Sequence, residues 1–211
     1  MENNYKAIVF DFGNVIIDID LNLTYKKFAE LTFKKPEKIK AIFEENSLFE
    51  KFETGHFDEN EFRDVVRQIL GFPLNDNEID LAWNSLLLEV PSHRFDYLER
   101  LRTKMPIYLL SNTNSIHIKK CKSYFRLKFG ISDFTQLFRE SFLSYEIELW
   151  KPDYKIYDYV LKSIKLDASE VLFLDDNADN IQAASDLGIQ TIKINPPECF
   201  TDVLSKIYLD V

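Results

Sequence analysis

Short apolar runs alternate with amphipathic stretches along much of the chain, and the two patterns predict different elements. Short runs rich in β-branched and aromatic residues predict buried strands. These runs are Ala7–Phe10, Pro106–Leu110, Val171–Leu174 and, as a fourth, Ile189–Ile194. Apolar positions at helical spacing predict helices over Ser115–Phe129, Asp153–Ile164 and Asn177–Leu187, the last closed by Gly188. Alternating strands and helices indicate an α/β fold with a parallel sheet covered on both faces.

The stretch from about Asn22 to Leu88 has a different pattern. Its apolar residues recur at helical spacing without a convincing buried strand, and breaks fall at Pro36, Gly55 and Gly71. We interpret this stretch as a helical insert between the first strand and the rest of the sheet. The predicted division is a core of residues 1–17 and 92–211 with an inserted helical domain of residues 18–91.

Composition limits the classes of partner. The 211 residues include 26 Lys and Arg against 35 Asp and Glu, which gives a formal net charge of −9. Nucleic acids and anionic membranes select clustered positive charge, so this balance argues against both as partners. A small phosphorylated substrate remains compatible, because a metal ion and a few local cations can reverse the field inside one pocket.

The two cysteines and the amino terminus indicate the compartment. Cys121 and Cys199 lie far apart and predict neither a disulfide framework nor a zinc site. The first apolar run stops at Asp11, and no run approaches the roughly 18 residues that a membrane helix needs. We therefore expect a soluble, cytoplasmic protein that acts as a monomer or weak homo-oligomer on a small molecule.

Polar residues follow directly after three of the predicted strands. They are Asp11, then Ser111–Asn114, then Asp175–Asn177, and Lys151 stands at the entrance to a predicted helix. Because the carboxyl ends of parallel strands meet at one edge of a sheet, we expect these carboxylates, the hydroxyl and the ammonium to converge. Such a set suits phosphoryl transfer through an aspartyl intermediate, with a divalent cation offsetting the repulsion between carboxylates and phosphate.

The order of these segments resembles the haloacid dehalogenase-like hydrolase superfamily. The four segments are Asp11-Phe12-Gly13-Asn14-Val15, Leu109-Leu110-Ser111-Asn112, Lys151-Pro152-Asp153 and Leu174-Asp175-Asp176-Asn177-Ala178-Asp179-Asn180. The residues of these segments are most similar to those of bacterial glucose-1-phosphate phosphatases of that superfamily. The resemblance implies a Rossmann-like three-layer α/β/α core, an inserted α-helical cap, and a Mg²⁺-dependent phosphatase acting on a small sugar phosphate such as glucose 1-phosphate.

The same resemblance implies a role for each matching residue. Asp11 is the expected nucleophile, and Mg²⁺ is expected on Asp11, the Gly13 carbonyl and Asp176. Ser111, the N–H of Asn112, and Lys151 are expected to hold phosphate, with Lys151 also clamping the nucleophile and with Gly13 and Asn14 at the same phosphate site. Asp175 and Asn180 are expected in supporting positions.

Gly13 departs from the phosphatase pattern, which places a second Asp at this position to protonate the leaving group. General acid–base help is typically worth about 10²- to 10⁴-fold, so its loss predicts slower chemistry rather than none. A water, Asn14, or Glu53 or His56 of the insert are the candidate substitutes. The turn around Gly55 is either a simple helix connection or the loop that the insert presents to the site.

Several alternatives stay open at this stage. A metal-independent haloacid dehalogenase also lacks the second Asp, although the Asp175–Asp176 pair argues against it. A phospho-receiver, or a catalytically silent phosphate-binding relative, is the third class. His93 and His117 are predicted to be ordinary surface residues, and the roles of Asp18 and Asp20, on the segment leading into the insert, are open.

Overall fold

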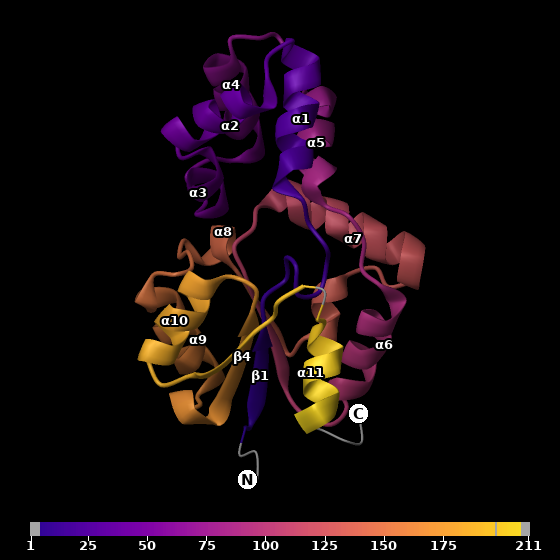
Figure 1. The fold of residues 1–211 in the computed structure, drawn as a ribbon, viewed down its shortest axis with the longest axis vertical. Helices are drawn as coiled ribbons and strands as arrows, with labels where there is room; N and C mark the ends of the chain where they lie inside the picture. The colour runs from indigo at the N-terminus through magenta and orange to yellow at the C-terminus, as the bar shows by residue number, and fades with distance from the viewer. Residues whose placement is uncertain (1–4, 197, 208–211) are drawn as a thin grey trace.

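The computed structural model describes residues 5–196 and 198–207 of the chain. A parallel sheet with helices on both faces forms the lower part of the molecule in Figure 1, and a group of helices stands above it. We call residues 18–91 the helical region and the other described residues the sheet region. Among the described residues, no helix is both long enough and apolar enough to cross a membrane.

The sheet has five parallel strands in the order β3-β2-β1-β4-β5. Their bounds are β1 Ala7–Phe10, β2 Ile107–Ser111, β3 Glu140–Leu143, β4 Val171–Asp175 and β5 Gln190–Lys193. The four predicted strands are confirmed. Strand β3 was not predicted, because Glu140 and Ser141 interrupt its apolar run and only its last two residues are buried.

The strands bury both faces, as the continuous apolar runs predict. Alternate residues of β1, β2 and β4 point to opposite sides and belong to two separate hydrophobic clusters. One face is covered by α6 (Ser92–Leu101), α7 (Ser115–Phe129) and α11 (Phe200–Ile207). The other is covered by α9 (Tyr154–Ile164) and α10 (Ala178–Asp186). The short helix α8 (Ser144–Ile147) and the 3₁₀ turns Phe134–Leu137 and Ala168–Glu170 lie in the connections. This three-layer α/β/α arrangement confirms the predicted fold class.

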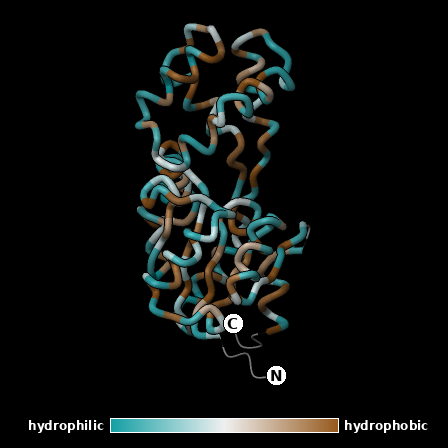
Figure 2. The backbone as a smooth tube through the Cα atoms, turned by 90° about the vertical axis from the view of Figure 1, so that its left-hand side faces the viewer, coloured by the Kyte–Doolittle hydropathy of each residue, from teal (hydrophilic) through white to brown (hydrophobic). Residues whose placement is uncertain are grey.

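The helical region has its own hydrophobic core. Its helices are α1 (Leu21–Thr32), α2 (Pro36–Glu45), α3 (Leu48–Glu53), α4 (Glu59–Leu70) and α5 (Asp76–Trp83), followed by a 3₁₀ turn over Asn84–Leu86. Capping boxes start α4 and α5, because Asp58 and Asn75 each accept from a backbone N–H three residues on. Trp83 is fully buried at the centre, with Phe49 stacked on it at 4.4 Å between ring centroids. Figure 2 shows this upper part as a separate body above the sheet region.

Two chain segments connect the helical region to the sheet region, and they run side by side. Asp18 donates its backbone N–H to Glu89 O at 2.9 Å and accepts from Leu88 N at 3.0 Å. Ile19 and Leu87 form an antiparallel bridge in the same pair of segments. The connection is therefore a short two-stranded ladder rather than two independent linkers.

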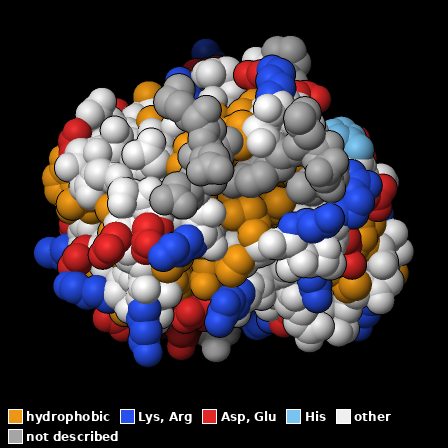
Figure 3. Space-filling model, turned by 90° about the horizontal axis from the view of Figure 1, so that it is seen from below, with side chains coloured by type: hydrophobic (Ala, Val, Ile, Leu, Met, Phe, Trp, Pro, Cys, Tyr) orange, Lys and Arg blue, Asp and Glu red, His pale blue; other side chains and the backbone are white. Residues whose placement is uncertain are grey.

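The face at the amino-terminal ends of the strands lies opposite the helical region. Seen from below, it carries Lys and Arg side chains interspersed with Asp and Glu around small hydrophobic patches (Figure 3). The cavity and the convergent polar residues lie at the other end, beneath the helical region, as the rule for open parallel sheets predicts.

Candidate active site

Three carboxylates meet where β1 and β4 end. The two strands pair in register, with Phe10 opposite Leu174, and Asp11 N donates to Leu174 O at 2.8 Å. Asp11, Asp175 and Asp176 each offer a carboxylate oxygen, and these oxygens lie within 4.8 Å of one another. The predicted convergence at one sheet edge is confirmed.

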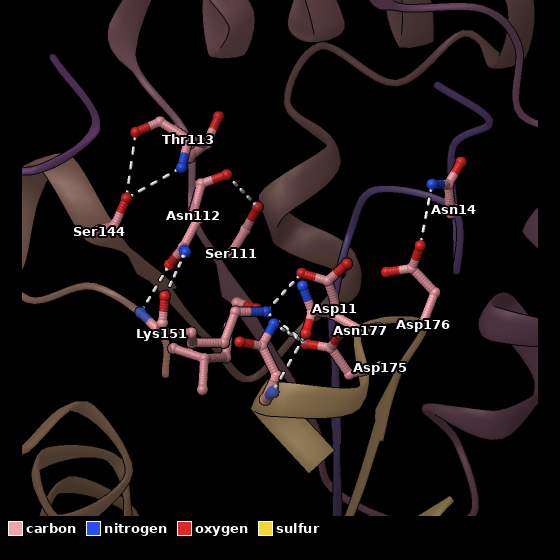
Figure 4. A network of polar contacts seen from close by, with 12 residues as sticks. Asp11, Asn14, Ser111, Asn112, Thr113, Ser144, Lys151, Asp175, Asp176 and Asn177 are labelled. Carbon is pink, nitrogen blue, oxygen red and sulfur yellow. Dashed lines mark hydrogen bonds and ion pairs between the residues drawn. The ribbon is translucent and has the colours of Figure 1, made fainter. Parts of the chain in front are cut away.

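Lys151 binds two of these carboxylates at once. Its Nζ donates to Asp11 Oδ1 at 2.6 Å and to Asp175 Oδ2 at 2.7 Å, and a third bond goes to Leu110 O at 3.0 Å (Figure 4). The residue is only 2% exposed, so it is not a solvated surface cation. All three protons of the ammonium are used, which fixes its position between the strand ends.

Burial and like charge set the electrostatics of the cluster. The pKa of Asp11 is raised to about 7, because burial and the neighbouring Asp175 and Asp176 together outweigh the opposing effect of Lys151. Burial raises the pKa of Asp176 as well, against a hydrogen bond from Asn14. Burial also opposes the charge of Lys151, but Asp11 and Asp175 outweigh it and hold the lysine pKa above its usual value. One ammonium among three carboxylates leaves excess negative charge, which favours a divalent cation.

Asn112 joins the end of β2 to the loop that carries Lys151. Its Nδ2 donates to Lys151 O at 2.9 Å, and its Oδ1 accepts from Lys151 N at 2.9 Å (Figure 4). The next residue, Thr113, donates its backbone N–H to Ser144 Oγ at 2.9 Å, which holds the segment after β2 against the start of α8. These bonds leave the side chain of Ser111 at the cavity wall, with a 3.4 Å contact to Asn112 O.

The two adjacent aspartates after β4 have different surroundings. Asp175 uses both oxygens: Oδ1 accepts from Asn177 N at 2.8 Å, and Oδ2 accepts from Lys151 and from Asn180 Nδ2 at 2.9 Å. Asp176 accepts from Asn14 Nδ2 at 2.9 Å through Oδ2. Among the described residues, the side chain of Asp176 therefore has fewer hydrogen-bond donors around it than that of Asp175.

Gly13 and Asn14 form the turn after Asp11. A Cβ built on Gly13 would lie 2.9 Å from Ile19 Cδ1 and 3.9 Å from Asp11 Oδ2, so a side chain here would begin beside the carboxylate of Asp11. Asn14 adopts the left-handed conformation at φ 54°, which suits Asn better than most residues. Both polar atoms of its side-chain amide are hydrogen-bonded. Nδ2 donates to Asp176, and Oδ1 accepts from Ile19 N at 3.1 Å.

These residues line one cavity of about 570 Å³ between the two regions. The floor is polar and comes from the sheet region. The upper walls come from Phe49 and Glu53 of α3, from Leu86 of the 3₁₀ turn, and from Ile19 and Leu87 of the connecting segments. The volume is within the range of small-molecule sites.

The structure brings together every predicted site residue. Those that line the cavity are Asp11, Gly13, Asn14, Ser111, Asn112, Lys151, Asp175, Asp176 and Asn180. Of the two insert candidates, Glu53 lines the cavity, whereas His56 is exposed and contacts Thr54 Oγ1 at 2.8 Å. Asp18 pairs with Arg94 at 2.7 Å, and Asp20 caps α1.

The surface position predicted for His117 is wrong, whereas His93 is exposed as predicted. His117 is 5% exposed and stacks on Trp83, with 5.4 Å between ring centroids. Its Nδ1 lies 3.0 Å from Asn84 Oδ1. Burial lowers its pKa to about 3, so the ring is neutral. The helical region covers this part of α7, a long-range contact that the local sequence around His117 does not reveal.

No role was predicted for Trp150 from the sequence, although its position next to Lys151 could have indicated that it lies at the site. Its Nε1 donates to Glu53 Oε2 at 3.1 Å, which ties the α3 end of the helical region to the lysine loop. Gly55 allows this approach: its φ is +76°, and a Cβ there would lie 2.7 Å from Tyr145 O of α8. The turn therefore meets the sheet region at van der Waals distance.

Comparisons with known proteins all indicate the same family and the same fold for this chain. A family model described as haloacid dehalogenase-like hydrolase matches residues 5–188. D-ribitol-5-phosphate phosphatase of Bacteroides thetaiotaomicron is 32% identical over 190 residues, which is 89% of this chain and 91% of that protein.

Solved structures give the same result. A HAD family enzyme of Bacteroides thetaiotaomicron, in complex with magnesium and inorganic phosphate, superposes with a TM-score of 0.85 at 33% identity, covering 94% of this chain and 98% of that one. A predicted HAD-like family hydrolase of Porphyromonas gingivalis has a TM-score of 0.88 at 25% identity, covering 98% of both chains.

Proposed function

The chain belongs to the haloacid dehalogenase-like hydrolase family, and we propose that it is a Mg²⁺-dependent phosphomonoesterase for small sugar or polyol monophosphates. One observation carries the proposal: Lys151 holds Asp11 and Asp175 at 2.6 and 2.7 Å inside a buried cluster of three carboxylates. Such a cluster carries excess negative charge, which a divalent metal ion can offset while it also binds the phosphate group of an ester.

In this proposal Asp11 is the nucleophile. An Asp11 carboxylate oxygen bonds to phosphorus, and the bond to the alcohol oxygen breaks, leaving an aspartyl phosphate that water hydrolyses. Lys151 keeps Asp11 ionised and oriented, and it stabilises charge that develops on the phosphoryl oxygens. Ser111 Oγ and the N–H of Asn112 bind those oxygens, with the Gly13–Asn14 turn on the opposite side.

The donor set fits magnesium. Carboxylate and carbonyl oxygens are its preferred ligands, and the three carboxylates lie close enough to share one ion. Asp11, the Gly13 carbonyl and Asp176 would hold it, since Asp175 already uses both oxygens on Lys151, Asn177 and Asn180. Bound there, the ion would neutralise charge on the nucleophile and on the phosphate.

The helical region is proposed as the cap domain over this site, with boundaries at residues 18–91 and a core of residues 1–17 and 92–211. Phe49, Glu53 and Leu87 then face the part of the substrate beyond the phosphate. Among the described residues that line the cavity, Lys151 is the only Lys or Arg, and its ammonium already binds two carboxylates. This charge pattern supports an uncharged, hydroxyl-bearing leaving group rather than a bisphosphate or a phosphorylated acid.

A phosphate-release assay tests the proposal. The protein is given glucose 1-phosphate, ribitol 5-phosphate, other sugar and polyol monophosphates, and fructose 1,6-bisphosphate, each with Mg²⁺ and with excess EDTA. We expect turnover of at least one monophosphate, loss of turnover in EDTA, and weaker turnover of the bisphosphate. No turnover of any ester would contradict the proposal, and halide release from a 2-haloacid in EDTA would favour a dehalogenase instead.

A further inference from the structure

The proposed reaction leaves one chemical task without a residue. The alcohol released from a sugar or polyol phosphate is a poor leaving group, so its oxygen needs a proton as the bond to phosphorus breaks. Gly13 supplies no side chain at the position next to the nucleophile, and Ile19 fills the space where one would project. The proton must come from water or from another group on the cavity wall.

Most of the other polar groups near the cavity are unsuited to this task. Asn14 does not titrate, and both ends of its amide are bonded, the nitrogen to Asp176 and the oxygen to Ile19 N. His117 is neutral, and its Nε2 is buried without a hydrogen-bond partner among the described residues, so it has no readily transferred proton. His56 is exposed and is not among the residues that line the cavity.

Glu53 meets the geometric requirements. It lies on the last turn of α3, lines the same cavity as Asp11, and comes from the region opposite the phosphate-binding floor. Trp150 Nε1 donates to its Oε2 at 3.1 Å, which anchors one carboxyl oxygen beside the Lys151 loop. The close contact of Gly55 with Tyr145 O holds the end of α3 against α8.

The environment of Glu53 also supports proton transfer near neutral pH. Burial raises its pKa to about 7, while the Trp150 hydrogen bond and the Lys151 charge act in the opposite direction. A carboxyl group with a pKa near the working pH can both give and take a proton, as a residue that serves as acid and then as base must do.

We propose that Glu53 is the general acid and base of the reaction, delivered from the helical region in place of a side chain at position 13. This inference rests on the proposed phosphatase function. As Asp11 bonds to phosphorus and the ester bond breaks, the carboxyl proton of Glu53 passes to the ester oxygen and frees the alcohol. The Glu53 carboxylate then takes a proton from water, whose oxygen bonds to phosphorus as the Asp11–phosphorus bond breaks. Inorganic phosphate leaves, and Glu53 is protonated again.

Leaving-group dependence tests this role. The Glu53→Gln variant keeps the size of the side chain but cannot give a proton as an acid. We measure kcat/KM, which reports the step that releases the leaving group, for the best sugar or polyol monophosphate and for p-nitrophenyl phosphate. The nitrophenolate leaves without protonation, so we expect a loss of about 10²- to 10⁴-fold on the sugar phosphate and under about 10-fold on the nitrophenyl ester.

Two controls separate the possible outcomes. Glu50→Gln lies on the same helix, is exposed, and should leave both kcat/KM values unchanged. Equal losses on the two esters in Glu53→Gln would overturn the acid–base role and make Glu53 a positioning residue, and unchanged values on both would also overturn it. If the wild-type protein hydrolyses neither ester, the proposed function itself fails, whatever the variant does.

Discussion

The sheet region and the helical region contribute to the same cavity in different ways. The sheet region supplies the carboxylates and the hydroxyl, at the ends of hydrogen-bonded strands, and the lysine, from the loop between α8 and α9. The helical region supplies apolar walls and one carboxyl, Glu53, from helices packed around Trp83. The reacting centre is therefore fixed by strand register, whereas the part of the site facing the leaving group depends on how the helical region docks.

Docking rests on two contacts of different kinds. The paired connecting segments around Asp18 and Leu88 hold the regions together at one side. At the other side, Gly55 meets Tyr145 O, and Trp150 bonds Glu53. Changes in the sheet region should therefore affect every substrate, and changes at the docking contacts should affect mainly substrates that need the helical region.

The largest expected effect is that of Asp11→Asn. Without the nucleophile, kcat should fall by at least about 10⁴-fold on both sugar phosphates and p-nitrophenyl phosphate. The fold should survive, because the change removes one charge from a cluster of three carboxylates. Steady-state phosphate release and thermal unfolding check this. A loss confined to sugar phosphates would contradict the role of Asp11.

Lys151→Met should have the next largest effect, now on stability as well as on activity. It leaves Asp11 and Asp175 buried without their cation, which should lower the free energy of unfolding by about 3–5 kcal/mol in the absence of metal. Added Mg²⁺ should restore part of that loss. Denaturant unfolding with and without Mg²⁺ is the measurement, and Lys155→Met, whose side chain is 78% exposed, is the control. Equal stability of the two variants would argue against the buried ion-pair account.

Gly55→Ala breaks the docking contact while leaving the sheet region intact. The new Cβ would meet Tyr145 O at 2.7 Å, so the end of α3 must move. We expect kcat/KM on sugar phosphates to fall by about 10- to 100-fold and the nitrophenyl ester to be less affected. Gly71→Ala is the matched control, because the φ of Gly71 is also positive but a Cβ there would meet no atom of the described part of the chain within 4 Å. It should lose about 1 kcal/mol of stability without loss of activity, and equal activity losses in the two variants would contradict the docking role.

The smallest expected effect is a pH-dependent difference in stability at Glu53. Its pKa is about 7 in the folded protein against an ordinary value of 4.5, so between these pH values the unfolded chain loses a proton that the folded protein keeps. The carboxyl therefore lowers stability as pH rises through that window. Relative to wild type, the free energy of unfolding of Glu53→Gln should increase by about 1–3 kcal/mol as pH rises from 4.5 to about 8. Denaturant unfolding at several pH values measures this difference. The exposed Glu50→Gln should show no such trend, and a flat difference for Glu53→Gln would contradict the raised pKa.

Much of the sheet region was predictable because its signals are local. Continuous apolar runs located β1, β2, β4 and β5, and the rule that parallel strands share a carboxyl edge placed Asp11, Ser111 and Asp175 together. Strand β3 escaped prediction since its first two residues, Glu140 and Ser141, are not buried.

Features that depend on contact between the two regions were not predictable in this way. His117 is buried only because Trp83, distant in sequence, stacks on it. Glu53 was one of several candidates until its bond to Trp150 and its place in the cavity were known. Both facts follow from how the helical region folds back on α7 and α8, which local periodicity does not specify.

The most direct test of the account is to trap the covalent intermediate. The protein is mixed rapidly with Mg²⁺ and the best sugar phosphate, quenched in acid during turnover, and digested for mass spectrometry, with Asp11→Asn as the blank. We predict one phosphoryl group on the peptide that contains Asp11, appearing before the steady state and absent from the blank. Phosphoryl transfer to another residue, or full turnover with an unmodified Asp11 peptide at every quench time, would contradict the central claim.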